Sequence, residues 1–311
     1  MLTVSFQSTQ QLRFLYEFDQ KGASAQEEKE GEKTLVKKSY CLYDSSIDFE
    51  QSQGGIKLFL PTAQGYINYN VVHTVSESIH ADIWRIGQAF AYDDQLEKSY
   101  PITPTGAEWD MALMLSGRDD FIGGFAHGDE KYTSFTVLID GKQIDPQGIK
   151  NLTPFTEITI LENSIGYDPN DHTTQVLKHD KEYIVHADGI TLNQTVEWLN
   201  DYTLGSSYMA MMPPLKALTD TFYTDRNEIP MPTLDHYGYY PNAKKAVVYG
   251  SDFSFSMSVS KYPSLTGGDR FLLTDNSGRP YNKMYFVICK GASVTGGDVW
   301  KTTTHYQISN R

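Results

Sequence analysis

The feature that most constrains the fold of this chain is a stretch of alternating sequence interrupted by an Asp-Gly pair. Residues 190–199 largely alternate between apolar and polar side chains, residues 178–187 become apolar from Tyr183 to Val185, and Asp188-Gly189 lies between the two runs. A period of two is typical of a strand with one buried face, and Asp-Gly between two such runs is the strongest short-range indication of a β-hairpin. This stretch therefore predicts two antiparallel strands.

Runs of the same kind recur along the chain, bounded by Gly, Asp, Ser and Pro. A second pair, Asp140-Gly141, follows the alternating residues Phe135, Val137 and Ile139. Many non-parallel strands at this spacing predict a mainly β fold, an antiparallel β-sandwich or jelly-roll with a few short helices. The remaining predicted strands cover residues 39–43, 56–60, 66–72, 245–249, 253–259, 281–288 and 299–308.

One segment has the pattern of a helix. Thr105 and Glu108 have capping-box spacing, apolar residues follow them, and Gly117 stands where helices commonly end. Residues 105–116 are therefore predicted to be helical. The pattern over residues 76–90 fits neither a helix nor a strand and predicts neither.

The length allows two ways of dividing the chain. With 311 residues it has room for one large domain or two closely packed ones. The predicted division is an N-terminal β-rich region at 1–104 and a main antiparallel sandwich at 105–311, with one continuous domain over 1–311 as the alternative. A Gly- and Glu-rich charged run at 21–38 predicts a mobile surface loop.

Composition excludes several classes of partner. The 26 basic and 39 acidic residues give a net charge of −13, which repels phosphate backbones, so no nucleic-acid partner is expected. No run reaches the roughly 20 apolar residues of a membrane span. The first residues lack the pattern of a signal peptide, which leaves the cytoplasm, a virion or secretion with the signal removed open.

No sequence motif fixes a cofactor. Cys41 and Cys289 lack metal-type spacing, and the chain has no Gly-x-Ser-x-Gly elbow, phosphate-binding loop or dinucleotide fingerprint. No cofactor is therefore expected. The sequence predicts no particular oligomeric state.

The predicted hairpin places unusual residues on one face. With Asp188-Gly189 as the turn, Val185 pairs with Leu192, and the pairs further from the turn bring mixed side chains together. These pairs are Tyr183 with Gln194, Lys181 with Val196, and His179 with Trp198. Titratable, amide and aromatic groups on one face suit a carbohydrate, whose rings are apolar and whose hydroxyls need donors and acceptors. Ordinary core packing is the alternative.

A glycine-rich loop at 119–130 presents His127 among small residues. His127 and Glu130 have a spacing found in some zinc sites, although no third ligand is identified, so no metal is predicted. Alternatively, Glu130 or Asp129 orients His127 as a general base. An ordinary polar turn is the third interpretation.

The end of the chain carries further candidates. Lys283 and Tyr285 alternate on one face of a predicted strand, and His305 lies opposite Trp300 on the last one. If Trp300 faces the core, we expect His305 to face solvent or a groove.

Residues 283–308, KMYFVICKGASVTGGDVWKTTTHYQI, resemble the closing strands of β-jelly-roll polysaccharide lyases and carbohydrate-binding sandwiches. The acidic, β-rich chain without a signal peptide is also similar to phage or prophage tail proteins that contact surface glycans. The resemblance implies a polysaccharide or surface glycan as partner. It also implies lyase chemistry, in which a base abstracts the proton next to a uronate carboxylate.

These arguments assign roles to ten residues. The predicted catalytic residues are His127, Tyr183, His179, Lys181 and Gln194, and the predicted substrate-binding residues are Trp198, Glu130, Lys283, Tyr285 and His305. The alternative function is a non-catalytic carbohydrate-binding, adhesion or virion structural protein.

Overall fold

The structure is a computed structural model in which residues 37–47, 52–106, 108–124, 126–275 and 278–311 are described. Across these residues the chain forms strands and no α-helix; the helical elements are two 3-10 turns, η1 (Pro146–Gly148) and η2 (Lys216–Leu218). The prediction of a mainly β, antiparallel sandwich fold is confirmed. The described part also contains no helix that is long and apolar enough to cross a membrane.

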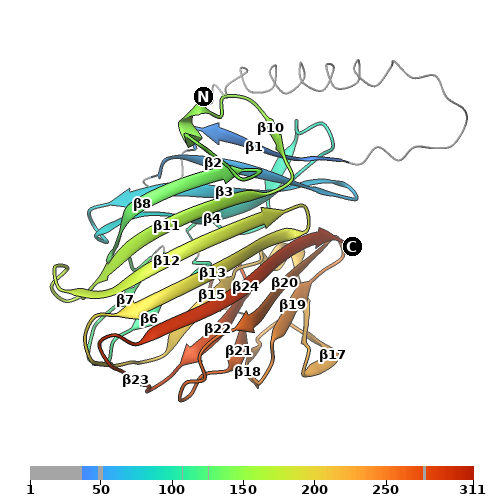
Figure 1. Ribbon diagram of the computed structural model, residues 1–311. Coiled ribbons are helices and arrows are strands. Elements are labelled where there is room, and N and C mark those ends of the chain that lie inside the picture. The colour runs from blue at the N-terminus through green and yellow to red at the C-terminus, as the bar shows by residue number, and fades with distance from the viewer. Residues whose placement is uncertain (1–36, 48–51, 107, 125, 276–277) are drawn as a thin grey trace, which may run out of the picture.

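A large sheet carries most of the strands. Neighbouring strands run antiparallel, except that β4 and β8 meet in parallel at one pair, Asp82 and Lys131. In Figure 1 its long central strands, β11, β12, β13 and β24, lie side by side. In spatial order the sheet comprises β10 (Thr153–Phe155), β1 (Ser39–Asp44), β2 (Ser52–Thr62), β3 (Gly65–Ser76), β4 (Ala81–Tyr92), β8 (Glu130–Ile139), β11 (Ile158–Tyr167), β12 (Gln175–His186), β13 (Gly189–Trp198), β24 (Val299–Asn310), β20 (Phe253–Lys261), β19 (Lys245–Tyr249), β16 (Thr221–Thr224) and β17 (Asn227–Pro232), with β5 (Ser99–Pro101) beside β4 and β9 (Lys142–Ile144) beside β8.

A smaller, four-stranded sheet lies against the large one, and side chains of both sheets join one hydrophobic core. Its strands in spatial order are β15 (Ser207–Met212), β22 (Lys283–Cys289), β21 (Arg270–Thr274) and β18 (Tyr237–Pro241). Two short pairs complete the fold, β6 (Leu113–Met114) with β7 (Phe121–Ile122), and β14 (Tyr202–Thr203) with β23 (Ser293–Val294).

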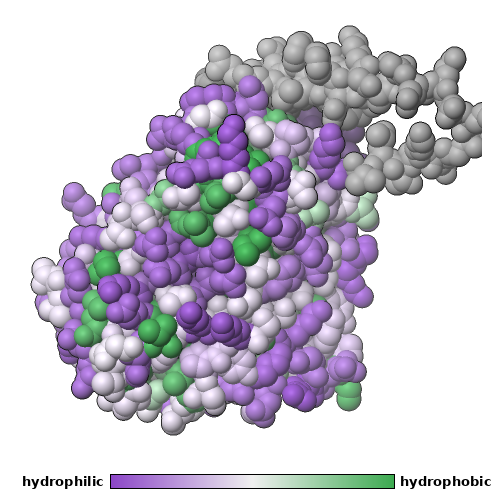
Figure 2. All heavy atoms as spheres, viewed as in Figure 1, coloured by the Kyte–Doolittle hydropathy of each residue, from purple (hydrophilic) through white to green (hydrophobic). Residues whose placement is uncertain are grey.

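The core follows from the alternation along the strands. Residues of β12, β13 and β24 are buried at every second position, and the core cluster runs from Cys41 to Ile308. Hydrophilic side chains dominate the outward face in view, with hydrophobic residues in small separate groups (Figure 2). Burying one face of each sheet removes apolar surface from water, and this burial is the main favourable contribution to folding.

The division into domains at residue 104 stays a prediction.

The predicted hairpin exists, but its register was predicted wrongly. Gly189 pairs with His186, so the turn consists of Ala187 and Asp188, and Val185 pairs with Ile190. Gly189 is needed for a different reason: a Cβ there would lie 2.2 Å from the carbonyl oxygen of Tyr306 on β24. Because the shift moves each pairing by two residues, the residues predicted to share a face still share it.

The actual pairs can be compared with the predicted ones. Lys181 lies opposite Gln194, and His179 lies opposite Val196. Tyr183 lies opposite Leu192, and Trp198 lies opposite Leu177. All of these inward-facing side chains point into the core.

The predicted helix at 105–116 is wrong. Ala112 exchanges backbone hydrogen bonds with Tyr208 of β15, and Leu113 and Met114 form strand β6. A surface helix buries one stripe of residues, whereas Trp109, Met111, Leu113 and Leu115 here lie in the core together with Asp110 and Ala112 between them. Pairing with a strand far along the chain outweighed the local capping pattern.

Other predictions have mixed outcomes. The Asp140-Gly141 turn joins β8 to β9 as predicted, with Ile139 opposite Lys142. The ambiguous segment 76–90 supplies most of strand β4. The predicted loop at 21–38 lies outside the described residues except for Lys37 and Lys38.

Candidate functional site

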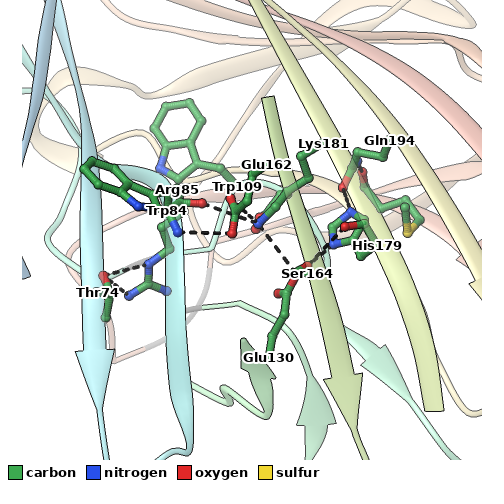
Figure 3. Close-up of polar contacts among 12 residues, drawn as sticks. Thr74, Trp84, Arg85, Trp109, Glu130, Glu162, Ser164, His179, Lys181 and Gln194 are labelled. Carbon is green, nitrogen blue, oxygen red and sulfur yellow. Dashed lines mark hydrogen bonds and ion pairs between the residues drawn. The ribbon is translucent and has the colours of Figure 1, made fainter. Parts of the chain in front are cut away.

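The hairpin residues build a charged cluster inside the sandwich. Lys181 Nζ lies 3.0 Å from Glu162 Oε2, 3.3 Å from Asp110 Oδ2 and 3.6 Å from Glu130 Oε1. His179 joins through Nδ1, 2.9 Å from Glu130 Oε1, and through Nε2, 3.1 Å from Gln194 Oε1 (Figure 3). We call Asp110, Glu130, Glu162, His179 and Lys181 the buried ionic cluster.

Burial and mutual attraction set the protonation of this cluster. Burial alone would raise the pKa of Glu130, but the charges of Lys181 and His179 outweigh it and hold that pKa far below its usual range. For Glu162 burial prevails over the attraction of Lys181, and with the negative charge of Glu130 it raises the pKa to about 7. Burial lowers the pKa of Lys181, but the neighbouring carboxylates raise it further, so Lys181 stays charged.

The buried ionic cluster is enclosed by protein. His179, Lys181, Tyr183, Gln194 and Trp198 are each at most 2% exposed, and so is Glu130. In this conformation a polysaccharide therefore does not contact them. Their catalytic and substrate-binding roles stay predictions, and a group that meets a polymer has to lie at the surface.

A second charged cluster, the His127 cluster, lies where solvent reaches it. The Nδ1 atom of His127 is 2.5 Å from Asp120 Oδ1, and its Nε2 atom is 3.9 Å from Glu108 Oε1. Lys283 donates a hydrogen bond from Nζ to Glu108 Oε2. The His127 side chain is 25% exposed, so its ring is held from both sides while part of it remains accessible.

Beside this cluster, tyrosines gather on one face of the four-stranded sheet. Register places Tyr239, Leu272 and Tyr285 in one row across β18, β21 and β22. The Tyr208 and Tyr285 rings are 4.7 Å apart, and the Tyr237 and Tyr239 hydroxyls are 3.2 Å apart. We call Tyr208, Tyr237, Tyr239 and Tyr285 the tyrosine face.

These phenols interact and differ in exposure. Tyr237 is 65% exposed and Tyr239 39%, whereas Tyr208 and Tyr285 are half-buried. Burial and the neighbouring Tyr285 and Tyr239 raise the pKa of Tyr208 to about 12. Burial and the Glu108 charge also raise the pKa of Tyr285, so both half-buried hydroxyls stay protonated and can donate hydrogen bonds.

A three-residue segment connects the two charged clusters. Glu108 reaches His127 and Lys283, whereas Asp110 reaches Lys181. Between them, the Trp109 carbonyl accepts hydrogen bonds from the Tyr306 hydroxyl at 2.5 Å and from the Met211 amide at 2.8 Å. The buried ionic cluster therefore helps to fix the segment that carries Glu108.

The pairing predicted between His127 and Glu130 is wrong. Glu130 contacts Ser164, His179 and Lys181, while Asp120 orients His127. The neighbouring Asp129 instead contacts His172, 2.6 Å away. Among the described residues no group of three or more His, Cys, Asp or Glu is arranged to hold a metal ion.

The candidate residues near the C-terminus lie in two different places. Lys283 and Tyr285 share a face as predicted, with Lys283 Nζ 4.8 Å from the Tyr285 ring centroid. Trp300 faces the core, and His305 lies on the other face of β24, where its Nδ1 is 3.1 Å from Thr191 Oγ1. His305 thus lies apart from the tyrosine face; its substrate-binding role stays a prediction.

Several residues of the surface site were missed in the sequence. In the sequence, Glu108 fits a helix cap, and nothing in the loop at 119–130 singles out Asp120 as the partner of His127. Tyr237 and Tyr239 alternate along β18, a signal that could have marked one face of a strand. Nothing in the local spacing places Tyr208 or Glu108 beside Tyr285.

No family model and no curated protein matches the chain. Solved structures with a similar arrangement of strands include the galactosidase domain of alpha-galactosidase-sucrose kinase, with a TM-score of 0.45, 10% identity, and coverage of 82% of this chain and 40% of that one. A protein from Escherichia coli K12 assigned as an aldose 1-epimerase has a TM-score of 0.43 and 10% identity over 81% of this chain and 99% of that one.

A third similar structure is 4-alpha-glucanotransferase from Thermococcus litoralis, with a TM-score of 0.43 and 8% identity over 88% of this chain and 40% of that one. This chain therefore spans about two fifths of the length of the first and third of these structures. These likenesses concern the arrangement of strands.

Proposed function

We propose that this chain is a glycan-directed β-sandwich protein that binds a saccharide on the tyrosine face. The observation that carries the proposal is the grouping of exposed and half-buried tyrosines beside the His127 cluster. Tyrosine rings cover the apolar faces of sugar rings, and their hydroxyls, with nearby charged groups, pair with sugar hydroxyls.

Exposure supports a binding role for this face. Large aromatic side chains usually lose their contact with water on folding, yet Tyr237 and Tyr239 remain 65% and 39% exposed on neighbouring positions of one strand face. Tyrosine is also enriched among the residues that contribute most to binding energy. A saccharide would cover this face.

Tyrosine truncation tests the binding proposal. Tyr239→Ala should weaken glycan binding about 5-fold to 30-fold, because removing an aromatic anchor costs about 1–2 kcal/mol. The measurement is affinity electrophoresis through gels that contain single polysaccharides. Tyr100→Ala is the control, since Tyr100 is 50% exposed but lies on β5 of the large sheet. Equal retardation of both variants would reject the tyrosine face as the binding surface.

A second candidate function is polysaccharide lyase activity, favoured by the geometry around His127. Asp120 holds Nδ1, which leaves Nε2, 3.9 Å from Glu108 Oε1, as the ring nitrogen that can accept a proton from a substrate. In β-elimination the base removes the proton next to the uronate carboxylate, the C–O bond to the leaving sugar breaks, and a C=C bond forms. The protonated Tyr285 hydroxyl can supply the proton that the leaving oxygen takes up.

Product absorbance tests the lyase proposal. Incubation with a panel of uronate polysaccharides should raise the ultraviolet absorbance of the unsaturated product. His127→Ala should lower this rate about 10²-fold to 10⁴-fold with little loss of stability, because a positioned proton-transfer group contributes that much. No absorbance change with any polymer would leave the protein as a binder.

A further inference from the structure

Arg270 lies within the tyrosine face. It pairs with Pro241 of β18 and Val287 of β22, and paired residues of an antiparallel sheet point to the same side. Tyr239, two residues before Pro241, lies diagonally opposite, and the Arg270 guanidinium carbon is 4.5 Å from its ring centroid. The aromatic surface therefore includes one permanently charged group.

No acidic side chain that the structure describes neutralises the charge of this guanidinium. Among the described residues no carboxylate lies within ion-pair distance of Arg270, whereas Arg118 pairs with Asp168 and Lys283 pairs with Glu108. The carboxylate next to Arg270 in sequence, Asp269, turns away and accepts hydrogen bonds from Lys244 and Tyr262.

Part of the Arg270 side chain is buried, so a hydrogen-bond donor there that has no acceptor is energetically unfavourable. Arg270 is half-buried, and its Nε atom is buried without a hydrogen-bond partner in the structure. A buried donor without an acceptor is unfavourable, and an arginine presents a planar fork that matches a carboxylate or a sulfate. In a chain with a net charge of −13, an unneutralised arginine on an aromatic surface is poised for an anion.

We infer that Arg270 binds the anionic group of an acidic sugar, a uronate carboxylate or a sulfate ester, while the tyrosine face holds the sugar ring. This inference rests on the proposed glycan function and names its substrate class. The Tyr239 ring stacks on the guanidinium and limits its movement, which reduces the entropy lost when the anion binds.

Two pairs of polymers test the inference with the intact chain. Polygalacturonate and its methyl ester share a backbone and differ in carboxylate charge; dextran sulfate and dextran differ in sulfate. Each charged polymer is compared with its neutral counterpart by affinity electrophoresis. We expect polygalacturonate, dextran sulfate or both to bind at least about 10-fold more tightly than the neutral counterpart, and the preferred pair identifies the anion.

A charge-matched pair of variants assigns the preference to Arg270. Arg270→Gln should lower affinity for the charged polymer about 10-fold to 100-fold and so remove most of the preference for it over the neutral counterpart. Arg226→Gln, in the exposed turn between β16 and β17, changes net charge equally and should have no effect.

Different failures have different meanings. Equal binding of charged and neutral polymers, with both weakened by Tyr239→Ala, would overturn the inference and leave the glycan function standing. Equal losses for Arg270→Gln and Arg226→Gln would also overturn it, because only general charge would then matter. Binding to none of the polymers would reject the glycan function and this inference together.

Discussion

At the residue scale, the same side-chain types have different consequences in the two charged clusters because water reaches only one of them. His127 is a quarter exposed and can meet a ligand, whereas His179 is fully buried and meets Glu130 and Gln194. A buried charge without a partner is far more costly than an exposed one. Lys181 is therefore expected to contribute to stability rather than directly to binding.

Replacing Lys181 tests this expectation. Lys181→Met should lower the free energy of unfolding by about 3–5 kcal/mol, because it leaves buried carboxylates without their cation. Urea unfolding followed by tryptophan fluorescence measures it. The control is Lys178→Met on the same strand, whose pair with Glu197 is 50% and 41% exposed. That change should cost less than about 1 kcal/mol, and equal losses would contradict the assignment.

At the scale of elements, the loop that carries His127 depends on close backbone packing. Gly128 has a φ of +75°, and a Cβ there would lie 1.8 Å from the Ile79 carbonyl oxygen. Gly117 has a similar φ of +80°, but a Cβ at that position would meet nothing within 4 Å. Comparing substitutions at the two glycines therefore distinguishes the cost of backbone strain from the cost of steric contact.

Alanine at these positions should have unequal effects. Gly117→Ala should cost about 1–2 kcal/mol for the left-handed conformation alone. Gly128→Ala should cost about 1–3 kcal/mol more, because its Cβ displaces packed backbone, and it should weaken glycan binding by moving His127. Thermal unfolding and affinity electrophoresis measure the two effects. Similar stabilities of the two variants would contradict the close approach.

For single strands, the alternation of the sequence correctly predicted which residues share a face, because local sequence controls that property. The faces of β12 and β13 follow from the period of two, which a shift of two residues preserves. Their register could not be predicted, because Gly189 accommodates the backbone of β24 and not the turn. The segment 105–116 was mistaken for a helix because its strand partner, β15, lies far along the chain.

The surface site was only partly predictable for the same reason. Lys283 and Tyr285 could be placed on one face because they are two residues apart on one strand. Glu108, Tyr208 and Tyr237 come from separate segments far from Tyr285 in the sequence. Strand pairing within the four-stranded sheet brings the two tyrosines near Tyr285, and tertiary packing brings Glu108 there. Spacing along the chain carries no information about such contacts.

At the scale of the whole molecule, the buried ionic cluster links the large sheet to the segment 108–110 that supports the surface site. Its carboxylates should give folding an unusual dependence on pH. The pKa of Glu162 is raised to about 7, whereas that of Glu130 is lowered. The stabilisation that ionised Glu130 gives to the folded state is present above the pKa that Glu130 has in the unfolded chain. It is lost as the pH falls through the lower pKa that Glu130 has in the folded state.

The contribution of Glu162 to stability changes with pH in the opposite direction. Its folded pKa of about 7 exceeds its ordinary value of 4.5, so between these values the folded state binds the proton more readily than the unfolded state does. The contribution of Glu162 to stability is therefore fully present below its unfolded pKa and is lost as the pH rises through about 7. Glu162→Gln removes this titration but keeps an oxygen that can accept the hydrogen bond from the Trp84 amide.

Urea unfolding of both proteins between about pH 5 and about pH 8 separates this effect from all shared titrations. The free energy of unfolding of the original chain, minus that of Glu162→Gln, should grow as the pH falls. Glu197→Gln, on the outer face of β13, controls for the lost charge. A difference that stays constant, or shrinks as the pH falls, would mean that Lys181 keeps Glu162 ionised. The surplus negative charge of the buried ionic cluster would then persist at mildly acidic pH.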